Sequence, residues 1–337
     1  MKLDTGLLAS SLNDVPQAAK VAEDMGFEAL WSVETSHDPF LPLALAAEHT
    51  RRIKLGTSIA VAFPRSPMVL AQIGWDLQAQ SDGRFILGLG TQVRGHNERR
   101  FGIKWEQPGP KLREMIQMIH AIWNCWQTGA RPNFEGKFYN FTLMTPFFNP
   151  GPIAHPQVPI YIAGVNEYMC RLAGELCDGF HVHPLHSIKY LDEVILPNMN
   201  KGLNARGRTR KDVALSSTPF VITGGSSAEI EAAKAPVRQQ IAFYASTPAY
   251  VHVLEVHGWG AVGPRLTQMS KRGEWGAMAN EITDEMLDVF AVTGPYDEIA
   301  TRVRKKYAGY LDRLAFYFPF RIEEKARWQP LIKAFNG

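Results

Sequence analysis

Eight strand-like runs alternate with helix-like runs along this chain, and this alternation constrains the fold more than any other feature. Parallel pairing is expected when helices separate the strands, because each crossover helix returns the chain to the same edge of the sheet. Eight such units predict an α/β fold, a closed (β/α)₈ TIM barrel rather than an open doubly wound sheet. The runs cover residues 3–8, 28–33, 53–61, 84–89, 159–163, 178–183, 213–223 and 312–318.

One residue conflicts with this pattern. Pro219 lies inside the seventh run, and a proline cannot donate a hydrogen bond to a strand ladder. We therefore expect a bulge at Pro219, or two shorter elements in place of one strand.

Two connections, after the fourth and the seventh strands, are much longer than the others. Residues 91–158 contain an expected amphipathic helix over 110–127 and then a hairpin-like stretch, NFEGKFYNF. Insertions of this length usually build the rim of an active site or a subunit contact. No linker or repeat divides the chain, so we predict a single domain over 1–337. The second insertion, 224–311, is expected to hold helices near 226–245, 248–257, 274–290 and 295–308.

Composition excludes several classes of partner. The net charge is +3 over 337 residues and there is no Lys/Arg run, which argues against a nucleic-acid partner. No apolar run reaches the roughly 18 residues that a membrane span requires, and we see no signal peptide. The three cysteines lack metal-ligand spacing and fit a reducing compartment. We expect a cytoplasmic soluble protein.

Familiar catalytic motifs are absent, and two histidines need an interpretation. The chain has no phosphate-binding P-loop, zinc-protease HExxH, CxxC or GxSxG motif. His181 and His183 flank one residue of a strand, so they point to the same face. They could bind a metal together with Glu34, or make ordinary hydrogen bonds at a wet cavity mouth. Because no second ligand pair is evident, we assign no metal-binding residue.

Barrel active sites lie at the carboxyl ends of the strands, and polar residues follow the second strand there. Glu34 and His37 place a carboxylate and an imidazole three residues apart, which suits proton transfer or hydrogen bonding to a cofactor. The alternative is that Thr35 or Ser36 caps a helix and the charges are solvated.

Two further segments suit an anionic ligand. Gly164, Val165 and Asn166 begin the helix after the fifth strand, and the free N–H groups of a helix N-terminus bind phosphate readily. A plain tight turn explains these residues equally well. Basic residues after the fourth strand could bind an anionic tail or form a solvated helix face: Arg94, His96, Arg99, Arg100 and Lys104.

The third run, LGTSIAVAF, is interrupted by Gly56, Thr57 and Ser58. Small residues weaken a strand interior and are typical of a bulge, or of a place where a ligand approaches the backbone closely. We expect a flat molecule to lie against this strand.

Together these features resemble the luciferase-like flavin and deazaflavin oxidoreductase superfamily, and most of all its coenzyme F420-dependent branch. The resemblance implies a (β/α)₈ barrel with insertions, in agreement with the strand count. The matching stretches span roughly 1–320 and include AEDMGFEALWSVE, HDPFLPLALAAEHT, IKLGTSIAVAF, SDGRFILGLGTQ, PIYIAGVNEYMCRLAGELCDGF and VTGPYDEIATRVRKKYAGYLDRLAF.

The resemblance also implies a cofactor, coenzyme F420, with FMN as the alternative. In deazaflavin-dependent members the third strand carries a bulge with a non-prolyl cis peptide behind the ring, and the matching bond here is Ser58–Ile59. Glu34 or His37 is implied as the proton donor or acceptor. The positions implied to bind the cofactor are Thr35, Gly56, Thr57, Ser58, Ile59, Gly90, Gln92, Val93, Gly164, Val165 and Asn166.

The expected activity is hydride transfer between the deazaflavin ring and an organic substrate that the sequence does not identify. Three alternatives stay open: an FMN-dependent monooxygenase, a metal-dependent barrel hydrolase using His181 and His183, and a non-catalytic flavin-binding barrel. Val93 replaces a glutamate that serves as an acid in one branch, so the sugar-phosphate chemistry of that branch is not expected. Relatives are often dimers, which implies a homodimer.

Overall fold

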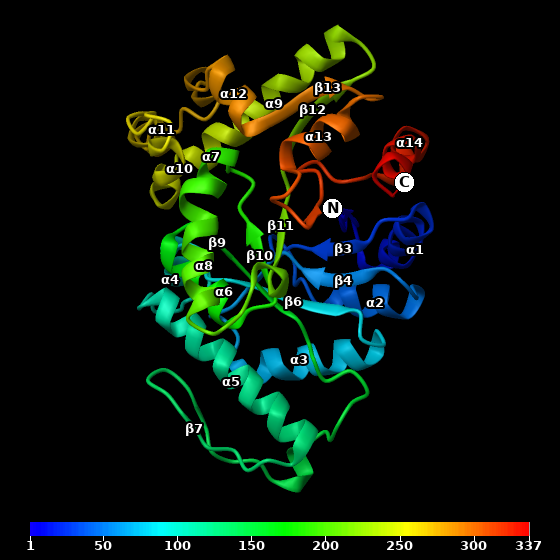
Figure 1. The fold of residues 1–337 in the computed structure, drawn as a ribbon, viewed down its shortest axis with the longest axis vertical. Helices are drawn as coiled ribbons and strands as arrows, with labels where there is room; N and C mark the ends of the chain where they lie inside the picture. Colours follow the sequence, from blue (N-terminus) through cyan, green and yellow to red (C-terminus); the bar gives the residue numbers. More distant parts are fainter. Residues whose placement is uncertain (337) are drawn as a thin grey trace.

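The computed structural model describes residues 1–336, and a barrel of parallel strands forms its centre (Figure 1). Within these residues ten segments join one sheet. They make eight strands, because the first and the third strand are each interrupted once. The strands are β1 and β2 (Lys2–Leu3 and Thr5–Gly6), β3 (Ala29–Ser32), β4 and β5 (Lys54–Thr57 and Ala60–Val61), β6 (Phe85–Gly90), β9 (Ile160–Gly164), β10 (Gly179–Val182), β11 (Ala214–Ser217) and β14 (Arg313–Leu314).

The pairing order shows that the sheet is closed. It runs β1-β14-β11-β10-β9-β6-β4-β3-β2, and each pairing along this path is parallel. Because β1 and β2 are successive parts of the first strand, both ends of the order are the same strand. The predicted (β/α)₈ barrel is confirmed.

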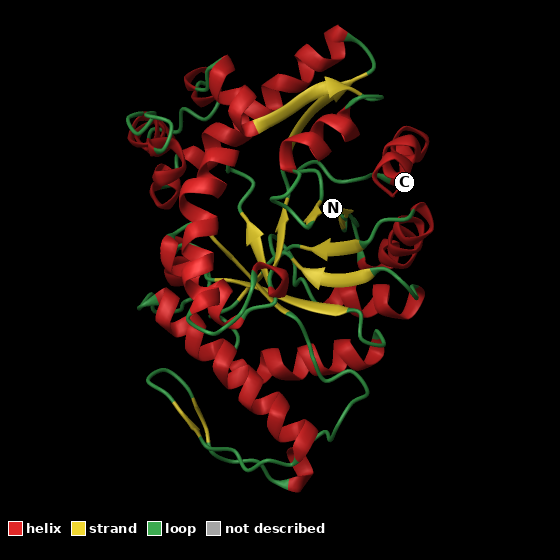
Figure 2. Cartoon of the chain, in the orientation of Figure 1, coloured by secondary structure: helices red, strands yellow, loops and turns green. Residues whose placement is uncertain are grey.

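Helices surround the strands on the outside (Figure 2). The first helix shows how local sequence sets its limits: a proline lies in its first turn, and Gly26, with φ of 91°, adopts the left-handed conformation that ends it. The barrel helices are α1 (Val15–Met25), α2 (Leu41–His49), α3 (Pro67–Gln80), α5 (Pro108–Thr128), α6 (Glu167–Leu176), α7 (Ile188–Tyr190) with the π-helical turn η3 (Leu191–Ile195) and α8 (Leu196–Asn204), α13 (Ile299–Tyr307) and α14 (Lys325–Asn336).

The first insertion follows its prediction. A short helix, α4 (Arg94–Arg99), precedes the long helix α5, and an antiparallel hairpin of β7 (Phe134–Glu135) and β8 (Asn140–Phe141) follows it. The turn η2 (Pro146–Phe148) leads back toward the barrel. In Figure 1 the hairpin lies beside α5, away from the barrel strands.

The seventh run divides at Pro219, the second of the two expected outcomes. Its first half is the barrel strand β11, and its second half, β12 (Phe220–Gly224), leaves the barrel and pairs in parallel with β13 (Ala291–Pro295). The sequence did not predict β13. The other parts of this insertion are α9 (Ser227–Ala245), η5 (Pro248–Tyr250), α10 (Val251–Glu255), α11 (Val262–Lys271), η6 (Met278–Glu281) and α12 (Asp284–Phe290).

Two helix predictions in this insertion were inaccurate. Helix α11 was missed, and the helix expected over 274–290 is limited to the turn η6 and the short helix α12. The hydroxyl of Thr283 accepts a hydrogen bond from the Met286 N–H and caps α12, so a new helix starts there. Within residues 1–336, no helix has the length and apolar character needed to cross a membrane.

A buried ion pair joins the first and last strands inside the barrel. Arg313 donates two hydrogen bonds to Asp4, from Nε to Oδ2 at 2.9 Å and from Nη2 to Oδ1 at 2.8 Å. Trp31 Nε1 donates to the same Oδ2 at 2.9 Å. Burial alone would lower the pKa of Arg313, but the charge and hydrogen bonds of Asp4 raise it. The barrel interior therefore holds a charge pair with its hydrogen bonds satisfied at the seam where the sheet closes.

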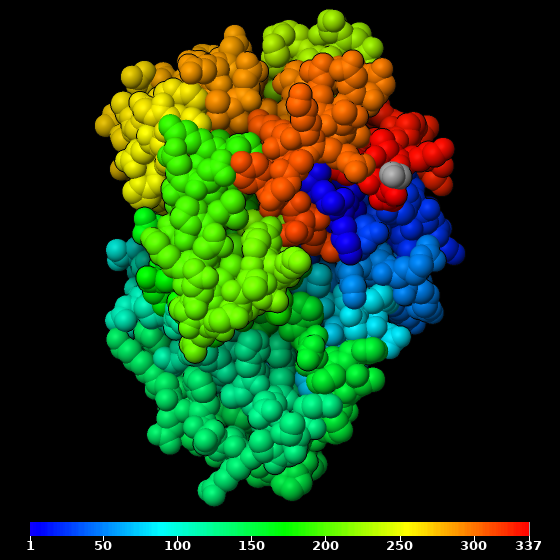
Figure 3. Space-filling view, viewed as in Figure 1, coloured from blue at the N-terminus to red at the C-terminus, as the bar shows by residue number. Residues whose placement is uncertain are grey.

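The C-terminal helix packs beside the N-terminal part of the chain. Figure 3 shows the red C-terminal segment against the blue N-terminal one. Trp328 of α14 contacts Phe27 with a centroid distance of 6.0 Å, and Asn336 donates to the Gly26 carbonyl at 2.8 Å. Helix α14 thus covers the outer surface near the barrel seam.

We expect Asp4→Asn to lower the free energy of unfolding by about 3–5 kcal/mol, because Arg313 would keep its charge in the barrel interior without a counter-charge. Replacing both partners, as Asp4→Asn with Arg313→Met, is expected to cost less than the sum of the single changes. Urea unfolding followed by circular dichroism measures both. Glu231→Gln, which breaks an exposed ion pair with Lys234, is the control and should leave stability near that of the wild type. An unchanged unfolding midpoint for Asp4→Asn would contradict this account.

Candidate active site

The third barrel strand contains a bulge opposite the fourth. Gly56 pairs with Ile86 and Ala60 pairs with Leu89, so four positions on the third strand face three on the fourth. One extra residue is therefore accommodated between Gly56 and Ala60. The peptide bond Ser58–Ile59 lies in this interval and is cis. Both the bulge and the cis bond agree with the predictions from the sequence.

A side chain replaces the missing ladder hydrogen bonds at the bulge. Thr57 Oγ1 donates to the Gly88 carbonyl at 2.6 Å and accepts from the Gly88 N–H at 2.9 Å. A Cβ on Gly88 would lie 1.7 Å from the Thr57 carbonyl oxygen, so any larger residue is excluded there. This contact explains why glycine stands at position 88.

Gly56 has a packing role. A Cβ at this position would lie 2.4 Å from Cζ3 of Trp31, so the indole ring occupies the space that a side chain would need. Gly56 and Thr57 are buried and do not line the cavity described below. We expected the small size of these residues to make room for a ligand. Instead, Gly56 makes room for the ring of Trp31, and the hydroxyl of Thr57 bonds Gly88.

Glu34 supports the bulge from the second strand. Its backbone N–H donates to the Ile59 carbonyl at 3.3 Å, and its Oε2 accepts from the Val61 N–H at 2.7 Å. Arg65 Nη1 donates to the same Oε2 at 2.8 Å, and its Nη2 donates to Asp38. The side chain of Glu34 is 7% exposed. Glu34 therefore holds the backbone just after the cis bond, at Ile59 and Val61, and its carboxylate belongs to a largely buried ion pair with Arg65.

The neighbouring loop residues lie at the surface. His37 and Thr35 are exposed and outside the cavity lining. The carbonyl of Thr35 accepts a hydrogen bond from Arg100 of the first insertion. That contact connects the loop after the second strand to the loop after the fourth.

A cavity of about 510 Å³ opens where β5, β6, β9 and β10 end. Its wall is mostly apolar, and the two insertions supply the side opposite the bulge. The predicted residues that it brings together are Ile59, Gly90, Gln92, Val93, Gly164, Val165 and Asn166. The lining also includes residues that the sequence did not predict, and no motif marks their positions: Trp105, Pro108, Gly109, Pro110, Tyr168, Met169, Ala249 and Tyr250.

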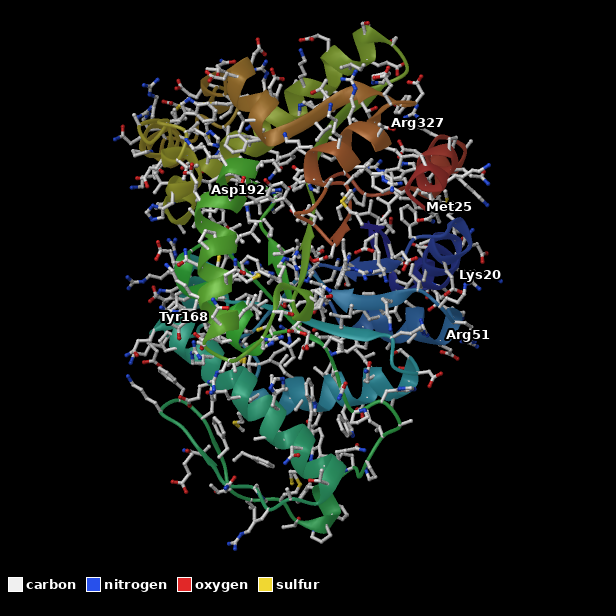
Figure 4. The ribbon with its side chains drawn as sticks, viewed as in Figure 1. Lys20, Met25, Arg51, Tyr168, Asp192 and Arg327 are labelled. Carbon is white, nitrogen blue, oxygen red and sulfur yellow. The ribbon has the colours of Figure 1, made fainter. Side chains whose placement is uncertain are left out.

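Helix α6 begins at the cavity wall. Asn166 Oδ1 accepts from the Met169 N–H at 3.0 Å and caps the helix. Tyr190 donates to the Val165 carbonyl at 2.5 Å and holds the preceding turn. Tyr168, labelled in Figure 4, lies between α6 and the first turns of α5, where Arg113 donates to its hydroxyl at 3.1 Å. The first N–H groups of α6 thus lie beside a firmly held turn.

The charge around the cavity is positive but partly paired. Among residues 1–336, Arg94 is the one charged side chain in the lining, and it bonds Glu98 at 3.1 Å. Lys104 bonds Glu106 at 2.9 Å. His96 and Arg99 are exposed.

The two strand-six histidines have different surroundings. His181 lies in the barrel interior, 4.9 Å from the Trp31 ring and 5.3 Å from the Tyr161 ring by centroids. His183 lines the cavity. Within residues 1–336, no group of three His, Cys, Asp or Glu side chains is placed to hold a metal ion. The geometry thus gives the hydrolase alternative no support.

A second, larger hollow of about 610 Å³ lies between the end of the first strand, α1 and the loop before α14. It contains none of the predicted cofactor or catalytic residues. We therefore take the 510 Å³ cavity as the candidate active site.

Comparisons with known proteins find relatives that match most of this chain. An uncharacterized protein of Mycobacterium tuberculosis is 49% identical over 324 residues, covering 96% of this chain and 95% of that protein. The 5,10-methylenetetrahydromethanopterin reductase of Archaeoglobus fulgidus is 30% identical over 294 residues, covering 85% and 83%. The solved structure of the coenzyme F420-dependent tetrahydromethanopterin reductase of Methanopyrus kandleri has a similar fold, with a TM-score of 0.78 and 21% identity, covering 98% and 96%.

The model of the luciferase-like monooxygenase family matches residues 2–313. This range contains the first seven barrel strands, both insertions and the first residue of the eighth strand, β14. The chain belongs to the luciferase-like monooxygenase family of oxidoreductases.

Proposed function

We propose that this protein is a coenzyme F420-dependent oxidoreductase that transfers a hydride between the deazaflavin ring and a small organic substrate. The observation that carries the proposal is the cavity beside the third-strand bulge, where seven of the predicted cofactor residues meet. The structural relative from Methanopyrus kandleri is a coenzyme F420-dependent reductase, which supports the choice of cofactor. A homodimer and a cytoplasmic location stay predictions.

The cavity suits a flat ring system. Its volume of about 510 Å³ lies in the usual range for small-molecule and cofactor sites. Ile59 and Gly90 provide adjoining apolar surface, and a Cβ on Gly90 would lie 2.6 Å from Ile59 Cδ1. The Ile59 side chain therefore lies over Gly90 and forms an apolar wall beside the bulge, which supports contact with the face of a planar heterocycle.

When bound, the deazaflavin would supply two-electron hydride chemistry, and the chain would supply position and surroundings. Ile59, Gly90, Gln92 and Val93 would hold the ring. The largely apolar wall would exclude water from the reacting atoms. Glu34 would act indirectly. Its backbone N–H donates to the Ile59 carbonyl and its carboxylate accepts from the Val61 N–H, so these bonds fix the backbone on which the ring would rest.

Proton transfer stays assigned to His37 or Glu34. His37 is exposed at the end of the second strand and has no hydrogen bond to another described residue, which supports exchange of a proton with solvent. The side chain of Glu34 is already bonded to Arg65 and to the Val61 N–H, which favours a supporting role. Of the two, His37 has no hydrogen-bond partner among residues 1–336 but lies outside the cavity lining, so its role stays a prediction.

The turn at Gly164, Val165 and Asn166 is proposed to bind the phosphate of the cofactor. The free N–H groups and positive end of α6 favour an anion there. Arg94 on the adjoining wall adds a positive charge.

FMN is the alternative cofactor, and an oxygen-dependent monooxygenase the alternative activity. The matched family model is named for such enzymes. FMN shares a flat tricyclic ring and a phosphate with F420, so the lining described above would suit both.

We expect the purified protein to bind F420 at least tenfold more tightly than FMN, a difference of about 1.4 kcal/mol. Fluorescence titration with each cofactor under the same conditions measures the two dissociation constants. Tighter binding of FMN would favour the monooxygenase, and binding of neither would contradict the proposal.

We expect Asn166→Asp to weaken F420 binding about five- to tenfold, because it places a negative charge beside the cofactor phosphate. Asp and Asn cap helices equally well, so thermal stability should stay near that of the wild type. The loss should shrink as salt is added. Ser226→Asp makes the equivalent change at the cap of α9 and should leave binding unchanged. Equal affinities of Asn166→Asp and the wild type would exclude a phosphate at this turn.

A further inference from the structure

His183 is held in one tautomer. Its Nδ1 accepts a hydrogen bond from the Leu185 N–H at 3.1 Å, so in the neutral ring the proton is on Nε2. Burial and the neighbouring His186 lower the pKa of His183 to about 3, so the ring is neutral at physiological pH. Nε2 is therefore an N–H donor with no partner among the described residues.

Two tyrosines from the second insertion fix the orientation of this ring. The centroid of Tyr250 lies 4.2 Å from that of His183 with a tilt of 40°, and the ring of Tyr244 lies 4.6 Å away at 82°. Tyr244 is itself held by a 2.7 Å hydrogen bond between its hydroxyl and that of Tyr317. Such contacts restrict the imidazole to one position in the wall of the cavity.

His181 provides an internal comparison. Its Nε2 also lacks a hydrogen-bond partner, but the ring is enclosed by Trp31 and Tyr161 and does not line the cavity. Only the second histidine of the pair thus presents its donor to a ligand.

The charges around the cavity restrict what the donor can bind. Among residues 1–336 no carboxylate lines the cavity, and its one cation, Arg94, is bonded to Glu98 and is assigned to the cofactor phosphate. A charged ligand group beside His183 would lose its hydration without gaining a counter-charge, which is costly. An uncharged oxygen acceptor would satisfy the donor at little cost.

We infer that His183 is a substrate-binding residue, which donates from Nε2 to an uncharged oxygen, a carbonyl or hydroxyl, on the substrate. This rests on the proposed function, in which the ring of the cofactor occupies the opposite wall at Ile59 and Gly90. The inference deepens that function by naming the class of substrate: a neutral carbonyl or hydroxyl compound whose apolar body packs against Tyr250 and Trp105.

The test uses two probes of the same shape, acetophenone and α-methylstyrene, which differ only in C=O against C=CH₂. We expect the full-length protein to bind the ketone about fivefold more tightly than the alkene, the usual worth of one hydrogen bond. His183→Phe keeps a ring and removes the donor, so it should bind both probes equally. His183→Gln keeps an N–H donor and should retain most of the preference. His252→Phe makes the same change at an exposed site and should behave as the wild type.

Each titration is made with and without F420. Failure of the wild type to bind F420 would remove the proposed function, whereas the probe preference of the cofactor-free protein would still decide the role of His183. A preference that persists in His183→Phe, is absent from the wild type, or is lost equally in both variants would overturn the inference.

A second measurement needs no variant. In protein labelled with ¹⁵N-histidine, the Nε2–H resonance of His183 should shift when acetophenone is added and should not shift with α-methylstyrene. An unchanged resonance with the ketone would overturn the inference even if His183→Phe failed to fold.

Discussion

The candidate site depends on how the barrel absorbs one extra residue in its third strand. Parallel strands pair residue by residue, so an inserted residue leaves backbone groups without ladder partners. Thr57 resolves this with one hydroxyl, which donates to and accepts from Gly88. Glu34 stabilises the other side by binding the Val61 N–H. With its polar groups satisfied in this way, the bulge turns Ile59 toward the cavity without opening the sheet.

The rest of the barrel is arranged to keep this strand in place. Trp31 occupies the space beside Gly56, and its indole N–H donates to Asp4, which pairs with Arg313 across the seam. A chain of direct contacts therefore runs from barrel closure to the bulge. Removing only one partner of the buried Asp4–Arg313 pair is costly. The stability of the barrel and the geometry of the bulge are therefore coupled through this pair.

Much of the fold could be predicted because it depends on local patterns. Alternating apolar runs and caps predicted the eight barrel strands, and the restriction that proline places on a ladder predicted the division at Pro219. The need for glycine at position 56 could not be predicted, because it comes from contact with the ring of Trp31, a residue distant in sequence. The far wall of the cavity was also missed. Tyr250 lies in the second insertion and Tyr168 in the first turn of α6. No repeating pattern in the sequence predicts that either side chain lines the cavity. The resemblance to a family supplied the cis bond at Ser58–Ile59, which composition and spacing alone do not indicate.

Hydrogen–deuterium exchange with and without F420 tests the central claim most directly, because it locates bound cofactor without knowledge of the substrate. The account predicts that F420 slows exchange at amides of residues 58–62, 90–94 and 164–168, around the 510 Å³ cavity. Protection confined to residues 5–10 and 320–323, which line the larger hollow beside α1, would contradict it, as would no change in exchange at saturating cofactor.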